Sequence, residues 1–242
     1  MRMRQLKNSK TQRIEGSKKR ENIMAKKRIG VLLAGCGVMD GSEIHEATLA
    51  LYFLDKHGAE AVCMAPNKDQ LDVVNHISGS AVPEKRNVLL ESARIARGKV
   101  QNVKTVKADD IDAIVIPGGY GAAKNLCTFA KDGPDCRADE DVARLLKELH
   151  RQKKPIGALC IAPALIAKLF GEHSVELTIG NDGGTASALE KMGAKHKNAA
   201  VDQIVVDSKN RIVTTPCYML AQSIKEVGDG AEKLVAKILE MI

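Results

Sequence analysis

The 242-residue sequence has few aromatic residues and no long apolar segment. Phe, Trp and Tyr together make up 2% of the chain and Trp is absent, which argues against the base-stacking surfaces that bind single-stranded nucleic acid. The longest uncharged apolar run, residues 156–167, is shorter than the roughly 20 residues that a membrane span requires. The N-terminus also lacks the apolar segment of a secretory signal. These absences favour a globular protein that does not cross a membrane.

The six cysteines, at positions 36, 63, 127, 136, 160 and 217, form no C-x-x-C motif and show no structural zinc spacing. Such usage is typical of a reduced, cytoplasmic protein rather than of a disulfide-stabilised secreted domain. A dinucleotide-binding fingerprint is not complete either, because Asp40 occupies the place of its third glycine. We therefore predict neither a metal nor a cofactor.

The net charge of +7 is concentrated at the N-terminus. Residues 1–24 contain eight Lys or Arg and two Glu, so six of the seven positive charges belong to this segment and the remainder of the chain is nearly neutral. We predict that residues 1–26 are a disordered basic extension and that the folded part does not bind nucleic acid. The alternative is an organellar transit peptide, which would place the protein in mitochondria instead of the cytoplasm.

From Arg28 onward, short β-rich runs alternate with helical patterns, which predicts one α/β domain over residues 27–242 with a mostly parallel sheet. Ser42 is the expected N-cap of the first helix. In such sheets the ligand lies beyond the carboxyl ends of the strands, so residues 35–46, 118–125 and 160–163 are the predicted site segments. Strands are expected at 28–34, 60–65, 113–116, 155–159, 204–206 and 211–214, and helices at 42–57, 87–96, 139–152, 162–170, 185–192 and 231–241.

Cys160 directly follows a predicted strand, and small residues stand two positions before and after it. A nucleophile elbow has this arrangement, because its strained turn leaves no room for larger side chains at those positions. The N-terminus of the next helix is expected to favour the thiolate. We predict that Cys160 is a nucleophile and that the other five cysteines are structural.

The two other segments offer partners for this thiol. Backbone N–H groups of Gly119 and Ile161 are expected to form an oxyanion hole. Glu43 and Glu46 lie one turn apart at the start of the first predicted helix, so either carboxyl is a candidate proton donor to the cysteine. His45 is expected to be a helix-surface or hydrogen-bonded residue.

Several long segments resemble the ElbB-type branch of the PfpI and Parkinson-associated deglycase superfamily: GCGVMDGSEIHEA, IPGGYGAAKNL, LCIAPALIAKLF and IVTTPCYMLAQSI. The resemblance covers residues 27–242. It implies a flavodoxin-like, mostly parallel sheet sandwiched by helices, as in class I glutamine amidotransferases, and a homodimer or larger assembly. Members of the branch are called glyoxalases, sigma cross-reacting proteins or isoprenoid-biosynthesis proteins with an amidotransferase-like domain.

The resemblance places the family's nucleophilic cysteine on Cys160 and its protonated glutamate on Glu46, which has the family's distance to Gly58; Glu43 is the second candidate. It implies a cofactor-free glyoxalase that converts glyoxal or methylglyoxal to glycolate or lactate through a cysteine hemithioacetal and an enediol. The alternative is a redox-sensing or stress-related accessory protein of an isoprenoid pathway, with a reactive cysteine and little catalysis.

Two departures from related enzymes limit the reaction class. Ile161 replaces the His that directly follows the cysteine in PfpI-type proteases. The last histidine, His196, has no Glu two residues later, unlike the late His of the amidotransferases. Without a recognisable Cys–His pair, neither peptidase nor glutaminase activity is expected.

Overall fold

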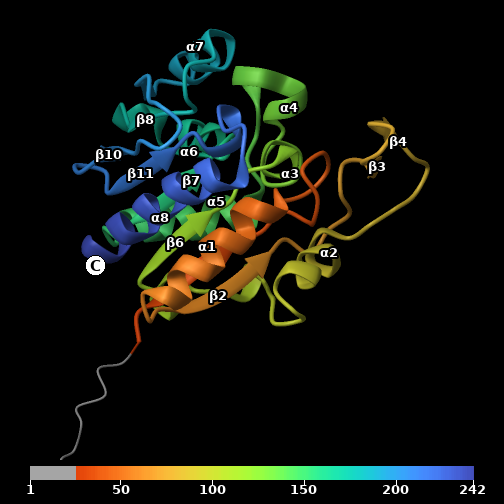
Figure 1. Ribbon diagram of the computed structural model, residues 1–242, viewed down its shortest axis with the longest axis horizontal. Coiled ribbons are helices and arrows are strands. Elements are labelled where there is room, and N and C mark those ends of the chain that lie inside the picture. The colour runs from red at the N-terminus through yellow and green to blue at the C-terminus, as the bar shows by residue number, and fades with distance from the viewer. Residues whose placement is uncertain (1–25) are drawn as a thin grey trace, which may run out of the picture.

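A seven-stranded sheet forms the centre of the computed structural model, which describes residues 26–242 (Figure 1). The predicted basic extension therefore lies outside the described residues except for its last position. All neighbouring strands are parallel except β10 and β11, so the predicted α/β class with a mostly parallel sheet is confirmed. From edge to edge the strands are β10 (Val205–Asp207), β11 (Ile212–Thr215), β7 (Ile156–Leu159), β6 (Ala113–Ile116), β1 (Arg28–Leu32), β2 (Glu60–Ala65) and β5 (Gln101–Asn102).

Helices cover both faces of this sheet. One face packs against α1 (Ile44–Lys56), α2 (Val88–Ile95) and α8 (Ile224–Glu240), and the other against α5 (Glu140–Arg151) and α6 (Pro163–Phe170). The side chains of β6 alternate between the two cores: residues 113 and 115 face α1 and α8, while residues 114 and 116 face α5 and α6. Burial on both faces explains why the central strands read as continuous apolar runs.

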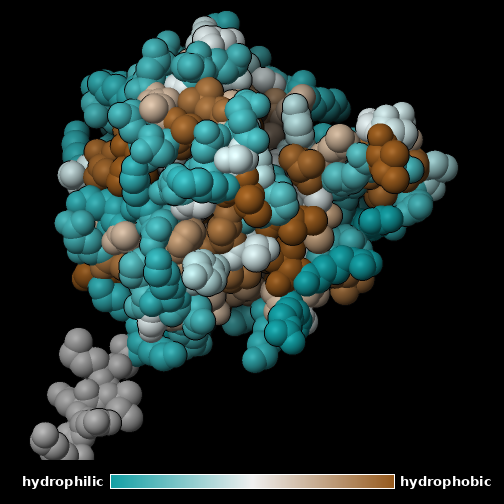
Figure 2. Space-filling view, in the orientation of Figure 1, coloured by the Kyte–Doolittle hydropathy of each residue, from teal (hydrophilic) through white to brown (hydrophobic). Residues whose placement is uncertain are grey.

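Shorter elements surround this sandwich. A hairpin formed by β3 (Val74–Asn75) and β4 (Ser80–Ala81) stands away from the sheet, and Figure 2 shows apolar side chains at its end, where Ile77 is fully exposed. No helix within residues 26–242 is long and apolar enough to cross a membrane. The remaining elements are α3 (Tyr120–Lys124), α4 (Phe129–Asp132), α7 (Gly183–Lys191), the pair β8 (Glu176–Leu177) and β9 (Lys195–His196), and 3-10 turns at Val103–Thr105, Ala108–Asp110, Gly133–Asp135, Gly171–His173 and Cys217–Met219.

Most predicted elements have bounds within two residues of the observed ones, but the predicted cap of α1 is wrong. The N-cap is Glu43, whose Oε2 accepts a hydrogen bond from the Glu46 amide at 2.7 Å. Ser42 is buried, and its Oγ accepts a hydrogen bond from the Ala34 amide at 2.8 Å. The serine therefore satisfies an amide just beyond β1 and leaves the helix start to the glutamate.

Helix α8 was predicted to begin at residue 231 but begins at Ile224. Gly228 and Gly230 hide this first part of the helix, because glycine has a low helix propensity. Gly230 is needed for packing: a Cβ there would lie 2.8 Å from Thr215 Oγ1 and 3.2 Å from the Val201 carbonyl oxygen. The close approach of α8 to β11 thus overrides the local propensity.

The parallel strands β1, β6, β7 and β11 end at the same edge of the sheet. Three of the segments that follow them were predicted to form the site. The fourth, the turn Cys217–Met219 after β11, was not, although the same strand-end rule applies to it.

The two glycines of α8 provide a test of this packing. Gly228→Ala is expected to raise the free energy of unfolding by about 0.5–1 kcal/mol, because its Cβ would meet only Leu49 Cδ2, at 3.9 Å. Gly230→Ala is expected to lower it by about 1 kcal/mol or more, because Thr215 and a backbone carbonyl obstruct the new methyl group. Urea unfolding followed by circular dichroism measures both; equal or greater stability for Gly230→Ala than for Gly228→Ala would contradict the packing described.

Candidate active site

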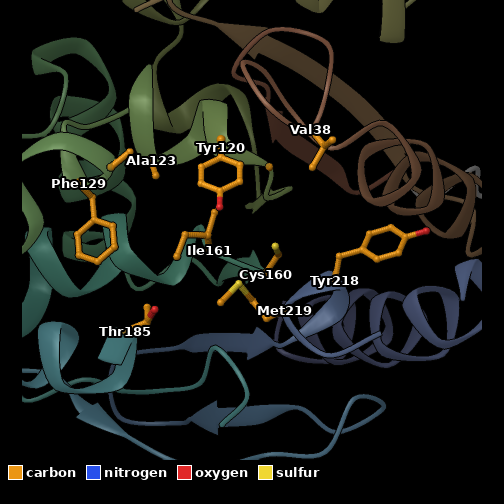
Figure 3. Close-up of a pocket in the computed structure, with 11 residues that line it drawn as sticks. Val38, Tyr120, Ala123, Phe129, Cys160, Ile161, Thr185, Tyr218 and Met219 are labelled. Carbon is orange, nitrogen blue, oxygen red and sulfur yellow. The ribbon is translucent and has the colours of Figure 1, made fainter. Parts of the chain in front are cut away.

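Cys160 occupies a strained turn between β7 and α6. Its φ is +57°, which is uncommon for a residue other than glycine. Its amide donates to the Thr215 carbonyl oxygen at 3.0 Å, so the backbone is held from the neighbouring strand β11. The residue is 7% exposed, and its side chain lies at the wall of a pocket (Figure 3). The structure therefore has the predicted elbow geometry at this cysteine.

Glu46 of α1 lies beside this thiol and is completely buried. Its Oε2 accepts a hydrogen bond from the Gly118 amide at 2.8 Å and its Oε1 accepts one from the Tyr218 amide at 3.2 Å. The carboxyl lies next to the Cys160 side chain, and each of the two groups shifts the pKa of the other. Burial, and secondly the negative charge of Glu43, raise the pKa of Glu46 to about 8. At neutral pH the carboxyl therefore carries a proton beside the sulfur.

Glu43 has a different position, although both glutamates were candidates for the cysteine's partner. One of its oxygens caps α1 by accepting from the Glu46 amide, and the other lies 4.0 Å from His45 Nδ1. The Glu43 amide donates to the Gly118 carbonyl oxygen at 2.9 Å. Glu43 thus orients the helix start, while Glu46 contacts the thiol.

The backbone amides of Gly119 and Ile161 lie beside the Cys160 sulfur and lower the pKa of its thiol. These are the two predicted donors, and both lie at strand ends, after β6 and β7. Gly119 has a φ of +89°, and a Cβ there would lie 2.4 Å from the Glu43 amide nitrogen. Glycine is therefore required for this amide to reach the sulfur.

The prediction that the helix start favours the thiolate is wrong in its net direction. Burial, followed by the negative charge of Glu46, raises the pKa of the Cys160 thiol, and the amides of Gly119 and Ile161 offset this only in part. The amides of the first turn contribute little, because Pro163 has no N–H and the amides of Ala162 and Ala164 donate to backbone carbonyls. In this site desolvation outweighs the helix dipole.

Gly118 keeps Cys160 and Glu46 in contact by having no side chain. A Cβ at this position would lie 2.5 Å from Cys160 Cβ and 2.8 Å from Glu46 Oε2. Since real Cβ atoms do not approach other atoms this closely, any larger residue would push the thiol and the carboxyl apart. The glycine-rich turn after β6 thus serves the site sterically as well as through its amides.

A pocket of about 330 Å³ opens over the sulfur (Figure 3). Part of its wall comes from the predicted site segments 35–46, 118–125 and 160–163, but α4, Thr185 of α7 and the turn after β11 also line it and were not predicted to do so. Among the described residues, no Asp, Glu, Lys, Arg or His lines it. The lining residues are Val38, Gly119, Tyr120, Ala123, Phe129, Ala130, Cys160, Ile161, Thr185, Tyr218 and Met219.

His45 is hydrogen-bonded, which is one of the two environments that were expected for it. Its Nδ1 lies 2.7 Å from the Tyr218 hydroxyl. This contact ties the turn after β11 to the start of α1, so the Tyr218 amide stays on Glu46. His196 lies elsewhere, with its Nε2 accepting from the Ile179 amide at 3.3 Å, and it makes no pair with Cys160. Within residues 26–242, no group of three or more His, Cys, Asp or Glu has a geometry that could hold a metal ion.

A flavodoxin-like sheet with a cysteine elbow beside a buried glutamate defines an amidotransferase-like class of protein. Residues 36–220 match the model of the DJ-1/PfpI family, and the chain belongs to this family. The match and the relatives below confirm the superfamily and the fold that the sequence motifs implied.

The named relatives match most of the chain. It is 46% identical over 224 residues to the rat "ES1 protein homolog, mitochondrial", covering 88% of this chain and 84% of that protein. It is also 46% identical to the human "glutamine amidotransferase-like class 1 domain-containing protein 3, mitochondrial", covering 88% and 83%. A crystal structure of an isoprenoid biosynthesis protein with amidotransferase-like domain from Ehrlichia chaffeensis is 38% identical, with a TM-score of 0.83, and covers 89% of this chain and 100% of its own.

The raised pKa of Glu46 predicts a pH-dependent stability. In the unfolded chain this carboxyl ionises near pH 4.5, whereas in the folded protein it keeps its proton until about pH 8. Its contribution to folding is therefore fully present below pH 4.5 and is lost as the pH rises to about 8. Glu46→Gln, which cannot ionise, is expected to gain stability relative to the wild type over this interval, by several kcal/mol.

Chemical unfolding at pH 5, 6, 7 and 8 measures the difference between the two proteins. Glu140→Gln, on the exposed first turn of α5, is the matched control and should follow the wild type at every pH. A Glu46→Gln difference that stays constant from pH 5 to pH 8 is incompatible with a proton held on Glu46.

Proposed function

We propose that the protein is a glutathione-independent glyoxalase that converts α-oxoaldehydes such as glyoxal and methylglyoxal to 2-hydroxy acids, with Cys160 as nucleophile and Glu46 as acid and base. The observation that carries this proposal is the buried Glu46 carboxyl lying next to the Cys160 side chain, which lines an open pocket. Membership of the DJ-1/PfpI family is compatible with such chemistry but does not specify it.

The active form in this proposal is the Cys160–Glu46 pair carrying a single proton. Glu46 loses its proton near pH 8, which leaves a thiol beside a carboxylate; the carboxylate takes the thiol proton as the reaction begins, and a thiolate then lies beside a carboxylic acid. The amides of Gly119 and Ile161 stabilise this thiolate. The pair thus avoids two negative charges in a buried site.

The thiolate attacks the aldehyde carbon, forming a carbon–sulfur bond, while the carbonyl electron pair moves to oxygen and takes the proton of Glu46. The resulting hemithioacetal carbon is bonded to the sulfur, so its hydrogen lies close to the carboxylate that now remains. Glu46 removes this hydrogen as a proton, giving an enediolate, and returns it to the adjacent carbon, while the hydroxyl proton on the oxygen of the first carbon passes to the oxygen of the second. The product is a thioester, in which the first carbon has been oxidised and the second reduced.

Hydrolysis completes the cycle. Glu46 takes a proton from water as the oxygen of water attacks the thioester carbonyl, and the thiolate leaves. The released product is lactate from methylglyoxal or glycolate from glyoxal. The cycle consumes one water, releases one proton and restores the one-proton pair, so no external oxidant or reductant is needed.

The alternative, a redox-sensing or accessory role, has weaker support. A peroxide sensor needs an accessible thiol with a low pKa, whereas Cys160 is 7% exposed and burial raises the pKa of its thiol. The link to an isoprenoid pathway rests on the name of the Ehrlichia relative. A purified protein without any aldehyde turnover would favour this alternative.

The location of the protein in the cell and its assembly into oligomers are also proposals. The names of the rat and human relatives include the word mitochondrial, which supports a transit peptide in residues 1–24 over a cytoplasmic location. These residues lie outside the described part of the chain. A homodimer or larger assembly is still a prediction from the family resemblance.

The direct test is the formation of lactate from methylglyoxal by the purified protein without glutathione. Cys160→Ala and Glu46→Gln are each expected to lower kcat/KM by about a hundredfold or more, because one removes the nucleophile and the other the acid–base group. Cys36→Ser is the matched control and should keep wild-type activity, since Cys36 does not line the pocket. No lactate from the wild type, or undiminished activity of Cys160→Ala, would refute the proposal.

The pH dependence gives a second test. Because the one-proton pair forms as Glu46 ionises, kcat/KM for methylglyoxal is expected to rise from pH 6 and level off above about pH 8. Buffer-only rates at each pH are subtracted, since α-oxoaldehydes also react in alkaline solution. A kcat/KM that stays constant or falls from pH 6 to pH 8 would contradict the proposal that the active pair carries a single proton.

A further inference from the structure

Within the described residues, the wall of the pocket has no charged side chain, and apart from the hydroxyl groups of Tyr120, Thr185 and Tyr218 its side chains are apolar, which a small, hydrated aldehyde does not require. Phe129 and Ala130 of α4, Ile161 after β7 and Met219 after β11 contribute much of it. In Figure 3, Ile161 lies between Cys160 and the ring of Phe129. An apolar path thus leads from the reactive sulfur toward α4.

The volume of the pocket also exceeds the needs of methylglyoxal. At about 30 Å³ for each water, 330 Å³ is room for roughly ten water-sized groups, and methylglyoxal would fill about half of it. A molecule twice that size fills the space and removes more apolar surface from water. Pockets near 300 Å³ are at the lower end of those that enclose organic ligands.

In the part of the chain that the structure describes, no charged side chain lines the pocket to pair with a charged substrate. The ammonium group of Lys124, which lies 5.7 Å from the centre of the Tyr120 ring, is bound to Asp72 at 2.8 Å and to the Met39 carbonyl oxygen at 2.9 Å. It is therefore occupied and is not part of the pocket wall. A carboxylate or phosphate on the substrate would be desolvated here without a counter-ion, which is strongly unfavourable.

We propose that this pocket selects neutral α-oxoaldehydes that carry an apolar side chain about the size of a phenyl ring, packed against Phe129 and Ile161. The inference rests on the proposed function for the reacting group, the α-oxoaldehyde. The preference for an apolar side chain depends only on the residues of the pocket wall. The reaction steps are those given above, with the phenyl group in place of the methyl group and mandelate as the product from phenylglyoxal.

The first experiment compares kcat/KM of the full chain for phenylglyoxal, methylglyoxal and a three-carbon α-oxoaldehyde phosphate. Phenylglyoxal is expected to exceed methylglyoxal by about tenfold or more, and the phosphate compound to be the poorest of the three. Phe129→Ala should lower kcat/KM for phenylglyoxal at least about tenfold more than for methylglyoxal. Because each aldehyde is compared with itself in the two proteins, the different intrinsic reactivities of the two aldehydes cancel. Phe129→Leu should recover much of the difference, and Ile77→Ala, at the exposed hairpin end, should change neither value.

A second measurement separates failure of selectivity from failure of the proposed function. Calorimetric titration of Cys160→Ala with acetophenone and with benzoate tests the pocket without chemistry. Acetophenone is expected to bind at least about tenfold more tightly than benzoate, and Phe129→Ala in the same background should weaken it. If no α-oxoaldehyde is turned over but acetophenone binds in this way, the proposed function fails and the selectivity stands. Two results would overturn the selectivity. One is equal kcat/KM values for phenylglyoxal and methylglyoxal that Phe129→Ala does not change; the other is no preference for acetophenone over benzoate.

Discussion

The contact between Glu46 and Cys160 is the interaction on which the site depends. Two acidic groups that face each other in a buried space cannot both ionise without a large cost, so a proton is held between them. The raised pKa values of both groups express this constraint. The same constraint gives one carboxyl the ability to donate and to accept a proton beside a single sulfur, which is what an isomerisation of neighbouring carbons requires.

The fold secures this contact from several directions. Cys160 is held by the elbow after β7 and by the carbonyl of Thr215 on β11, and Glu46 by amides that follow β6 and β11. Gly118 leaves the space in which the two side chains meet. Since parallel strands end at one edge of the sheet, segments distant in sequence converge there.

The sequence was sufficient to predict the sheet, most of the helices and the elbow, because apolar runs and small residues around Cys160 are local signals. The sequence pattern alone could not show whether Glu46 or Glu43 is the partner of Cys160. Both stand at the start of one helix, and only the capping role of Glu43, which displaced the expected cap Ser42, shows which carboxyl turns inward. The family resemblance ranked them in the order that the contacts now support.

Other features depend on tertiary structure and left no local signal. The ionisation of Cys160 was predicted from the helix start, but burial, which a sequence does not report, has the larger effect. The early start of α8 was not predicted because Gly230 has a low helix propensity, whereas the structure needs a glycine there for the close contact with β11. Phe129 and Met219 reach the pocket from short elements with weak patterns, so the apolar wall emerges only when the strand ends are assembled.

The protonation of Glu46 can be measured directly by infrared difference spectroscopy of the purified protein during a pH titration. The account predicts a carboxylic acid band at pH 7 that disappears with a midpoint near pH 8 and is absent from Glu46→Gln. A Glu46 band that has already vanished by pH 6 would show an ionised carboxylate at neutral pH and contradict the central claim.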